Sequence, residues 1–206
     1  MIDRSSIQNI YPLSPAQQGM LFHSLLEPES GVYVVNVRFK VYGPLNERAF
    51  GAAWSELVRR HDVLRSAFVW ENLERPLQVV GVAGESSFAC EYVSKDEFED
   101  SRNVVELPLV AGQQAFNLNN APLMRVTLVP LEAQVHQVIW TYHHLILDGW
   151  SLPLLLQEWG AIYDEANSSG SYERLPSELP YRDYIAWLEH QDHDAAKKFW
   201  ENYLKA

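Results

Sequence analysis

One stretch decides how this chain folds, and it reads Tyr142-His143-His144-Leu145-Ile146-Leu147-Asp148-Gly149-Trp150-Ser151. An apolar segment, 135–141, leads into it, and a leucine-rich helical pattern, 152–163, leads out of it. The pattern therefore predicts that the histidines lie where a strand ends and a loop turns towards the start of a helix. Polar side chains at such a position can be aimed into a cleft.

The two adjacent histidines can do different jobs. Consecutive residues of an extended chain point to opposite sides, so one of His143 and His144 can face a cleft while the other anchors the loop. A neutral imidazole takes up a proton near pH 7, because its unperturbed pKa is about 6.5. The pair therefore indicates proton chemistry or proton positioning at the end of the strand.

The residues after the histidines are suited to shaping the loop. Asp148 could orient a histidine, or it could pair with a buried arginine and hold the loop. Gly149 would let the backbone adopt a conformation that is closed to other residues. Ser151 is a plausible N-cap for the following helix, whose start would point free N–H groups towards the loop.

Three plainer interpretations of the motif remain open at this point. The histidines can be satisfied polar groups beside a core, since buried polar side chains are normally hydrogen-bonded. A metal site would need a third or fourth ligand, and no Cys pair or HExxH sequence accompanies the histidines. A Ser-His-Asp hydrolase would need a G-x-S-x-G elbow, which the sequence lacks. We therefore expect neither a metal nor a cofactor bound by the chain itself.

The composition restricts the class of protein. Of the 206 residues, 47% are hydrophobic, enough for one sizeable core or one large lobe. The net charge of −11, with no basic block, argues against nucleic acid or an anionic membrane as a partner. The single cysteine, Cys90, excludes an internal disulfide framework and fits a reducing compartment. No signal peptide or membrane-spanning run is evident, so we expect a cytoplasmic protein.

Hydrophobic periodicity divides the rest of the chain into helices and strands. Ser14, Pro15 and Gln17 provide the N-cap, the first position and the capping box of a helix that should end near Leu26. A second helix, capped by Asn46, carries an apolar stripe and should end near residue 60. Further helices are expected over much of 101–114 and over 152–166, 181–188 and 194–204, and strands over 33–42, 77–82, 87–93, 124–128 and 135–142.

Several motifs in this order resemble a known family. His143-His144-x-x-x-Asp148-Gly149 resembles the HHxxxDG signature of the condensation domains of nonribosomal peptide synthetases, which have the chloramphenicol-acetyltransferase fold. Residues 13–23 and 60–68 resemble the first and second condensation motifs, the second with Asp62 for Glu and Ser66 for Thr. Residues 116–125 resemble the PFDL…PLLR element of the family, with an Asn where Asp is usual.

The resemblance implies the fold class and the organisation of the chain. We expect an α+β fold, a two-layer α/β sandwich with a mixed sheet and packed helices. Because the domains of this family are about twice as long and contain two similar lobes, residues 1–175 should form the N-terminal lobe. Residues 176–206 should form a helical crossover towards a C-terminal lobe that is missing here. The aromatic face of the last helix would then be open, so self-association of the fragment is expected.

The resemblance also implies an activity, which is amide formation. The amine of an acceptor aminoacyl group would attack a donor acyl or peptidyl thioester. Each substrate would be carried on the phosphopantetheine arm of a carrier domain, upstream for the donor and downstream for the acceptor. An α-amine has a pKa of about 8, so a histidine could remove or position its proton at modest cost. The isolated lobe should be inactive, because one wall of the substrate tunnel would be missing.

Roles for the motif residues follow from the same resemblance. His144 would act on the amine proton, and His143 would shape the loop. The Gly149 N–H would face the developing oxyanion.

The second motif would supply a partner for the acid of the first. Asp148 would pair with Arg60 or Arg65 and so tie the loop to the sheet. Removing Asp148 from such a buried pair would cost about 3–5 kcal/mol.

Two other functions share these features. Epimerisation domains also carry HHxxxDG, but the order Gly149-Trp150-Ser151 favours condensation, because epimerisation domains more often show a DGxSW-like sequence. Residues 14–23 resemble the condensation subtype that accepts a donor ending in a D-residue. The second of these functions is that of a lobe that serves only as a docking surface for carrier domains.

Overall fold

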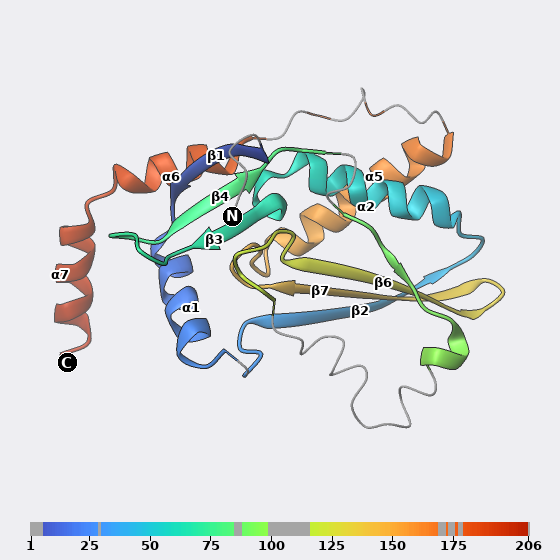
Figure 1. Ribbon diagram of the computed structural model, residues 1–206, viewed down its shortest axis with the longest axis horizontal. Helices are drawn as coiled ribbons and strands as arrows, with labels where there is room; N and C mark the ends of the chain where they lie inside the picture. Colours follow the sequence, from blue (N-terminus) through green and yellow to red (C-terminus); the bar gives the residue numbers. More distant parts are fainter. Residues whose placement is uncertain are drawn as a thin grey trace.

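Two β-sheets and the helices packed on them make up the described part of the chain (Figure 1). The computed structural model describes residues 6–28, 30–84, 88–98, 116–168, 172, 176 and 179–205. The strands are β1 (Ile7–Pro12), β2 (Val34–Tyr42), β3 (Ser66–Val69), β4 (Leu77–Gly81), β5 (Glu91–Tyr92), β6 (Met124–Glu132) and β7 (Val135–His143). The helices are α1 (Pro15–Leu26), α2 (Glu47–Arg60), the 3-10 turn η2 (Asp62–Arg65), α5 (Ser151–Ser168), α6 (Tyr181–Glu189) and α7 (His193–Tyr203).

The larger sheet has the strand order β2-β7-β6-β5. β7 pairs antiparallel with β2 and β6, whereas β5 joins β6 in parallel, so the sheet is mixed and the expected fold class is confirmed. The predicted alternation of β2 is also confirmed, because Phe39 and Val41 pack against the core while Arg38 and Lys40 are exposed. Since β7 has a partner on each side, its last residue, His143, is held in a fixed register.

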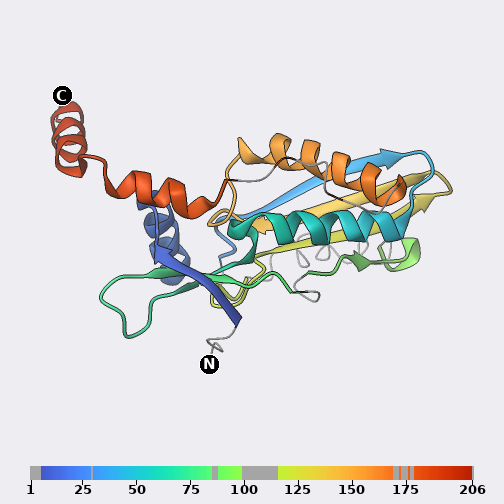
Figure 2. The same ribbon diagram turned by 90° about the horizontal axis from the view of Figure 1, so that it is seen from above.

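Helices α2 and α5 lie side by side and pack on the larger sheet (Figures 1 and 2). The predicted apolar stripe of α2 is confirmed, since Phe50, Trp54 and Leu57 are fully buried. The ring of Trp54 lies 5.0 Å from that of Trp140 in β7 and 5.7 Å from that of Trp159 in α5. Large aromatic side chains dominate core energetics. This cluster therefore fixes the strand that ends at the histidines relative to the helix that follows them.

The smaller sheet, β1-β4-β3, is antiparallel and carries α6. Ile185 of α6 is buried against Tyr11 and Val80. Helix α7 has no buried residue, and Figure 2 shows it projecting away from both sheets. Its Phe199 and Trp200 are 59% and 55% exposed, so its aromatic face has no packing partner in the part of the chain that the structure describes.

One local expectation differs from the structure. The strand expected over 87–93 is reduced to the two residues Glu91–Tyr92 at the edge of the sheet, where short strands resist unwanted pairing. The segment after α2 forms the 3-10 turn Asp62–Arg65 before β3 begins. The helix expected over 101–114 lies outside the described residues. Among the described residues, no helix has the length and apolar character needed to cross a membrane.

Candidate active site

The backbone at the end of β7 directs the two histidines to opposite sides. The His143 N–H donates to the Leu123 carbonyl at 3.0 Å, beside β6, and the His144 N–H donates to the Tyr33 carbonyl at 2.8 Å, beside β2. Both residues thus keep a backbone hydrogen bond to a neighbouring strand, but β7 ends at His143 and His144 begins the turn that follows. The contacts of the two rings show which histidine anchors the loop and which one faces a cavity.

His143 is the buried member of the pair, with 3% of its surface exposed. Its Nδ1 accepts a hydrogen bond from the Leu145 N–H at 3.1 Å, so the ring proton lies on Nε2. Nε2 lies 3.3 Å from the Ser24 hydroxyl oxygen, which can accept a hydrogen bond from the Nε2–H group. Burial, followed by the neighbouring His144, lowers the pKa of His143 to about 4. His143 is therefore a neutral residue that holds the loop in shape.

His144 is half-buried and has the opposite tautomer. Its Nδ1 lies 2.8 Å from the Leu147 carbonyl oxygen, which can only accept a hydrogen bond. In the neutral ring the proton therefore lies on Nδ1, and Nε2 carries the lone pair. Nε2 makes no hydrogen bond with any residue that the structure describes, whereas the ring packs edge-on against Tyr142 at 6.2 Å. The geometry leaves a proton acceptor at Nε2.

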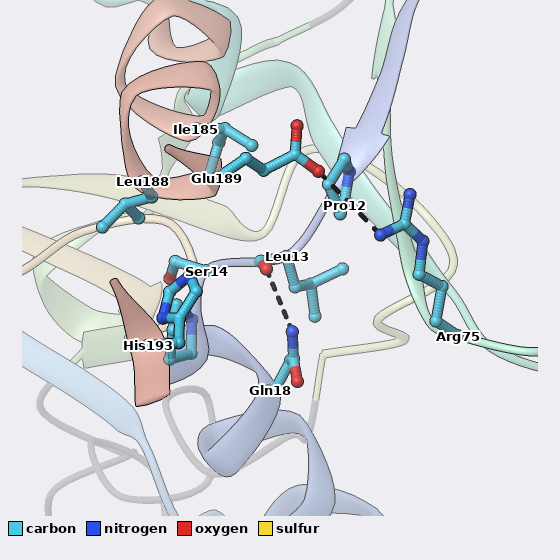
Figure 3. A pocket seen from close by; sticks show the side chains of 10 residues that line it. Pro12, Leu13, Ser14, Gln18, Arg75, Ile185, Leu188, Glu189 and His193 are labelled. Carbon is cyan, nitrogen blue, oxygen red and sulfur yellow. Dashed lines mark hydrogen bonds and ion pairs between the residues drawn. The ribbon is translucent and has the colours of Figure 1, made fainter. Parts of the chain in front are cut away.

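A cavity of about 510 Å³ is lined by His144. Its walls come from the start of α1, the histidine loop (residues 143–150), α5 and α6, and include Met20, Leu154 and Tyr181. His143 lines a different cavity of about 350 Å³ beside α1. A third cavity, about 430 Å³, lies where the start of α1 meets Arg75 and α6, and neither histidine lines it (Figure 3). Only the first of these three places His144 beside space for a substrate.

Asp148 has a different role from the one expected. Its side chain is exposed, and Oδ1 accepts hydrogen bonds from the Ser151 N–H at 2.9 Å and the Ser151 hydroxyl at 2.7 Å. The hydroxyl bond is the largest of the contacts that hold the pKa of Asp148 below its usual value. The capping acceptor at the start of α5 is therefore Asp148, and Ser151, predicted as the cap, is the first helical residue and the donor.

The predicted ion pair between Asp148 and an arginine is not formed in the described part of the chain. Arg60 donates from Nε to Glu158 at 2.5 Å and from Nη2 to the Pro176 carbonyl. Arg65, 4% exposed, donates to Asp62 at 2.8 Å, within its own turn. Each arginine thus binds a different acid, and Asp148 binds the start of α5. The expectation of a buried ion pair at Asp148 was therefore wrong.

Gly149 is not required by the backbone either. It does not have a positive φ, and a Cβ at this position would meet no heavy atom within 4 Å. The expected need for a conformation closed to other residues is therefore wrong. The glycine instead leaves open space next to the loop that carries His144.

Two polar contacts that the sequence reasoning missed also lie at the cavity wall. His61 Nε2 lies 2.6 Å from Glu158, and both residues belong to the wall that includes His144. Burial raises the pKa of Glu158, but hydrogen bonds from Arg60 and His61 outweigh the effect of burial, so that the pKa of Glu158 lies below its usual value. Gln17, identified only as part of a capping box, also donates to the Leu145 carbonyl. Neither contact has a sequence signal, because each joins residues far apart in the chain.

Residues 7–206 match the family model described as Condensation domain. The chain belongs to the condensation-domain family. The resemblance inferred from the motifs is thereby confirmed for nearly the whole chain. The mixed sheet, the buried first histidine and the accessible second histidine described above are thus features of a member of this family.

Curated relatives of this condensation-domain chain are much longer proteins. The chain is 41% identical over 208 residues to a linear gramicidin synthase of Brevibacillus parabrevis, covering 97% of the chain and 4% of the relative. It is 34% identical over 200 residues to bacitracin synthase 1 of Bacillus licheniformis, again covering 97% and 4%.

Solved structures share the fold over about half their length. The starter condensation domain of rhizomide synthetase RzmA superposes with a TM-score of 0.76 at 21% identity, covering 95% of this chain and 50% of that chain. The X-domain from teicoplanin biosynthesis gives a TM-score of 0.76 at 22% identity, covering 99% and 44%.

The capping role of Asp148 leads to a prediction for Asp148→Ala. The substitution should lower the free energy of unfolding by about 0.5–2 kcal/mol, the usual value of an N-terminal cap, and not by the larger cost of a broken buried pair. Because the folded-state pKa is lowered, the carboxylate contribution is complete above about pH 4 and is lost as pH falls through the folded pKa. Urea unfolding between pH 7 and pH 3 measures both effects.

Asp148→Asn is the matched control, since it keeps an acceptor for Ser151 and removes the charge. It should lose less stability than Asp148→Ala at pH 7. A loss of unfolding free energy above about 3 kcal/mol in either variant would show instead that Asp148 belongs to a buried ion pair.

Proposed function

We propose that this lobe supplies the histidine face of an amide-forming site. The amine of an acceptor aminoacyl group attacks the carbonyl carbon of a donor thioester, and His144 Nε2 accepts or positions the proton that the amine loses. The C–S bond breaks as the amide bond forms, and the departing thiolate takes the proton from the histidine to become the thiol. The observation that supports this role is the Nδ1–H bond to Leu147, which leaves the Nε2 lone pair free on a side chain that lines the 510 Å³ cavity.

The chemistry asked of His144 is modest. An α-amine has a pKa of about 8, so a substantial fraction is already neutral at pH 7 to 8. A positioned acid–base group contributes about 10²–10⁴-fold to the rate. Alignment of two tethered substrates can supply about 7–11 kcal/mol of barrier lowering. His144 therefore acts mainly by holding the amine in line with the thioester and receiving its proton.

We further propose that the substrates arrive on the phosphopantetheine arms of carrier domains, the donor from upstream and the acceptor from downstream. The chain itself would hold no cofactor. Among the described residues, no group of three or more His, Cys, Asp and Glu side chains is placed to hold a metal ion. Residues 176–206 would lead from the lobe formed by 1–175 to a second lobe that closes the cavity, since the solved relatives are about twice as long.

His144→Ala, in a two-lobe domain that contains residues 1–206, should lower amide formation by about 10²–10⁴-fold with little loss of stability. Transfer between two loaded carrier domains, followed by mass spectrometry, measures the product and the configuration of its donor residue. His190→Ala is the matched control. His190 also has its Nδ1 against a backbone carbonyl, that of Ala186 at 2.6 Å, but it is exposed and lines none of the three cavities described above. Near wild-type turnover by a well-folded His144→Ala protein would remove His144 from the mechanism.

Gly149→Ala separates folding from chemistry. Because a Cβ at this position meets nothing within 4 Å, the free energy of unfolding should stay within about 0.5 kcal/mol of wild type. If substrate reaches the open space beside Gly149, which is not among the residues that line the 510 Å³ cavity, the added methyl group would displace it, and a misplacement of about 1 Å can cost about 10²-fold in rate. Urea unfolding and the carrier assay provide the two measurements. Wild-type turnover would show that this space is not used by substrate.

The isolated 206-residue chain should fold but not form amide bonds, because substrates would not be confined on the open side of the cavity. It should also self-associate at high concentration through the exposed Phe199, Trp200 and Tyr203 of α7. Light scattering over a dilution series measures association, and Trp200→Asp should reduce it. Robust dipeptide formation by the isolated chain would contradict the requirement for a second lobe.

A further inference from the structure

Within the histidine loop, Leu145 is 2% exposed, and side chains bind both of its backbone polar groups. Its N–H donates to His143 Nδ1 at 3.1 Å, and its carbonyl accepts a hydrogen bond from Gln17 Nε2 at 2.9 Å. Both backbone polar groups of Leu145 are therefore bound by side chains. Leu145 has no helix or sheet partner, so these two side chains, together with the core packing of its own side chain, position it.

Gln17 is itself buried, with 3% of its surface exposed, and its side chain uses three hydrogen bonds. Its Oε1 accepts from the Ser14 N–H at 2.9 Å, which closes the capping box of α1. Its Nε2 donates to Leu145 and also to Gln78 Oε1 of β4 at 2.7 Å. One side chain thus links the start of α1, the smaller sheet and the histidine loop.

The Gln17 amide satisfies all three partners. Leu145 and Gln78 both present oxygen acceptors, so the group between them must donate two hydrogens, while the Ser14 N–H needs an acceptor. A carboxylate in place of the amide would put an oxygen against the Leu145 carbonyl, which can only accept, whereas Gln78 could turn its own amide to donate. A buried polar group that loses its partner is strongly disfavoured, and more so if it is charged. The contact is therefore specific for the amide and not for side-chain volume.

The position of Leu145 determines the setting of the second histidine. His144 precedes it in the chain, and the His144 ring is oriented by the Leu147 carbonyl two residues beyond it. A displacement of Leu145 would move the chain on both sides of that hydrogen bond. We propose that Gln17 is a positioning residue, whose side-chain amide fixes Leu145 and thereby the tautomer and aim of His144. The proposal rests on the function proposed for His144.

The test uses Gln17→Glu in the two-lobe domain. This variant keeps an oxygen for the Ser14 N–H and replaces the two-hydrogen donor. We expect kcat to fall by up to about 10²-fold, with KM for both carrier-bound substrates changed by less than about threefold. Gln18→Glu is the matched control, because the neighbouring Gln18 also donates to a backbone carbonyl, that of Leu13 at 3.1 Å, but lines the cavity of Figure 3 and not that of His144. It should leave kcat unchanged.

A pH profile separates positioning from general destabilisation. The carboxyl group introduced by Gln17→Glu is buried, and burial raises a carboxyl pKa. Once protonated it can donate one hydrogen bond to Leu145. The ratio of variant to wild-type kcat should therefore rise as pH falls from about 8 to 6, while the ratio for Gln18→Glu stays flat. Gln17→Met, which keeps the volume and carries no buried charge, should show the same loss without recovery and covers the case in which Gln17→Glu does not fold.

Nitrogen NMR of the histidine rings makes the test independent of turnover. Wild type should show His144 protonated on Nδ1, and both Gln17 variants should show a mixture of tautomers. If His144→Ala retains wild-type activity, the proposed function fails, but the ring tautomers still decide the role of Gln17. An unchanged His144 tautomer in Gln17→Met, or a kcat loss no larger than that of Gln18→Glu, overturns the proposal.

Discussion

The hydrogen bond from the Leu145 N–H to His143 Nδ1 is the interaction on which the histidine loop depends. It gives a buried imidazole an acceptor role, which assigns its proton to the nitrogen on the Ser24 side. Together with the hydrogen bond from the Ile146 N–H to the His143 carbonyl, it turns the chain just after β7, so that the next histidine keeps its Nε2 open to a different cavity. A residue that does no chemistry thus determines the geometry of the one proposed to do it.

Packing behind the loop makes that geometry stable. The strand that ends at His143 is central in its sheet, and Trp140 within it packs against Trp54, which contacts Trp159 of the following helix. The loop therefore joins two elements that are already fixed to each other by a buried aromatic cluster. Only its own few backbone groups remain to be positioned, and side chains from α1 and β7 supply those contacts.

The features that could be predicted from the sequence are those set by neighbours along the chain. The capping box of α1, the alternation of β2 and the apolar stripe of α2 depend on residues within a few positions, and all three are present. The opposite orientations of the two histidines follow from strand geometry in the same way. The fold class and the family were accessible because several motifs occur in the expected order.

The features that could not be predicted depend on which distant groups meet. Asp148 had two reasonable partners by charge, yet the nearest donor was three residues away at Ser151. Each arginine of the second motif forms an ion pair with an acid that periodicity does not identify: Arg60 with Glu158 and Arg65 with Asp62. Gln17 meets Leu145 across 128 positions, and its first role as a cap concealed the second. A local sequence pattern predicts one hydrogen bond of a side chain, but it does not predict the partners of the other donors and acceptors on that side chain.

The buried, neutral state of His143 makes the loop sensitive to acid. Its folded-state pKa of about 4 lies below the value of about 6.5 expected for the unfolded chain. Above about pH 6.5 neither state binds a proton there, so the stabilising contribution of the neutral ring is complete. As pH falls from about 6.5 towards 4, the unfolded state takes up a proton that the folded state refuses, and stability decreases. Below that range the ring protonates in place, its Nδ1 becomes a donor facing the Leu145 N–H, and the hydrogen bond that shapes the loop is replaced by a repulsion between two donors.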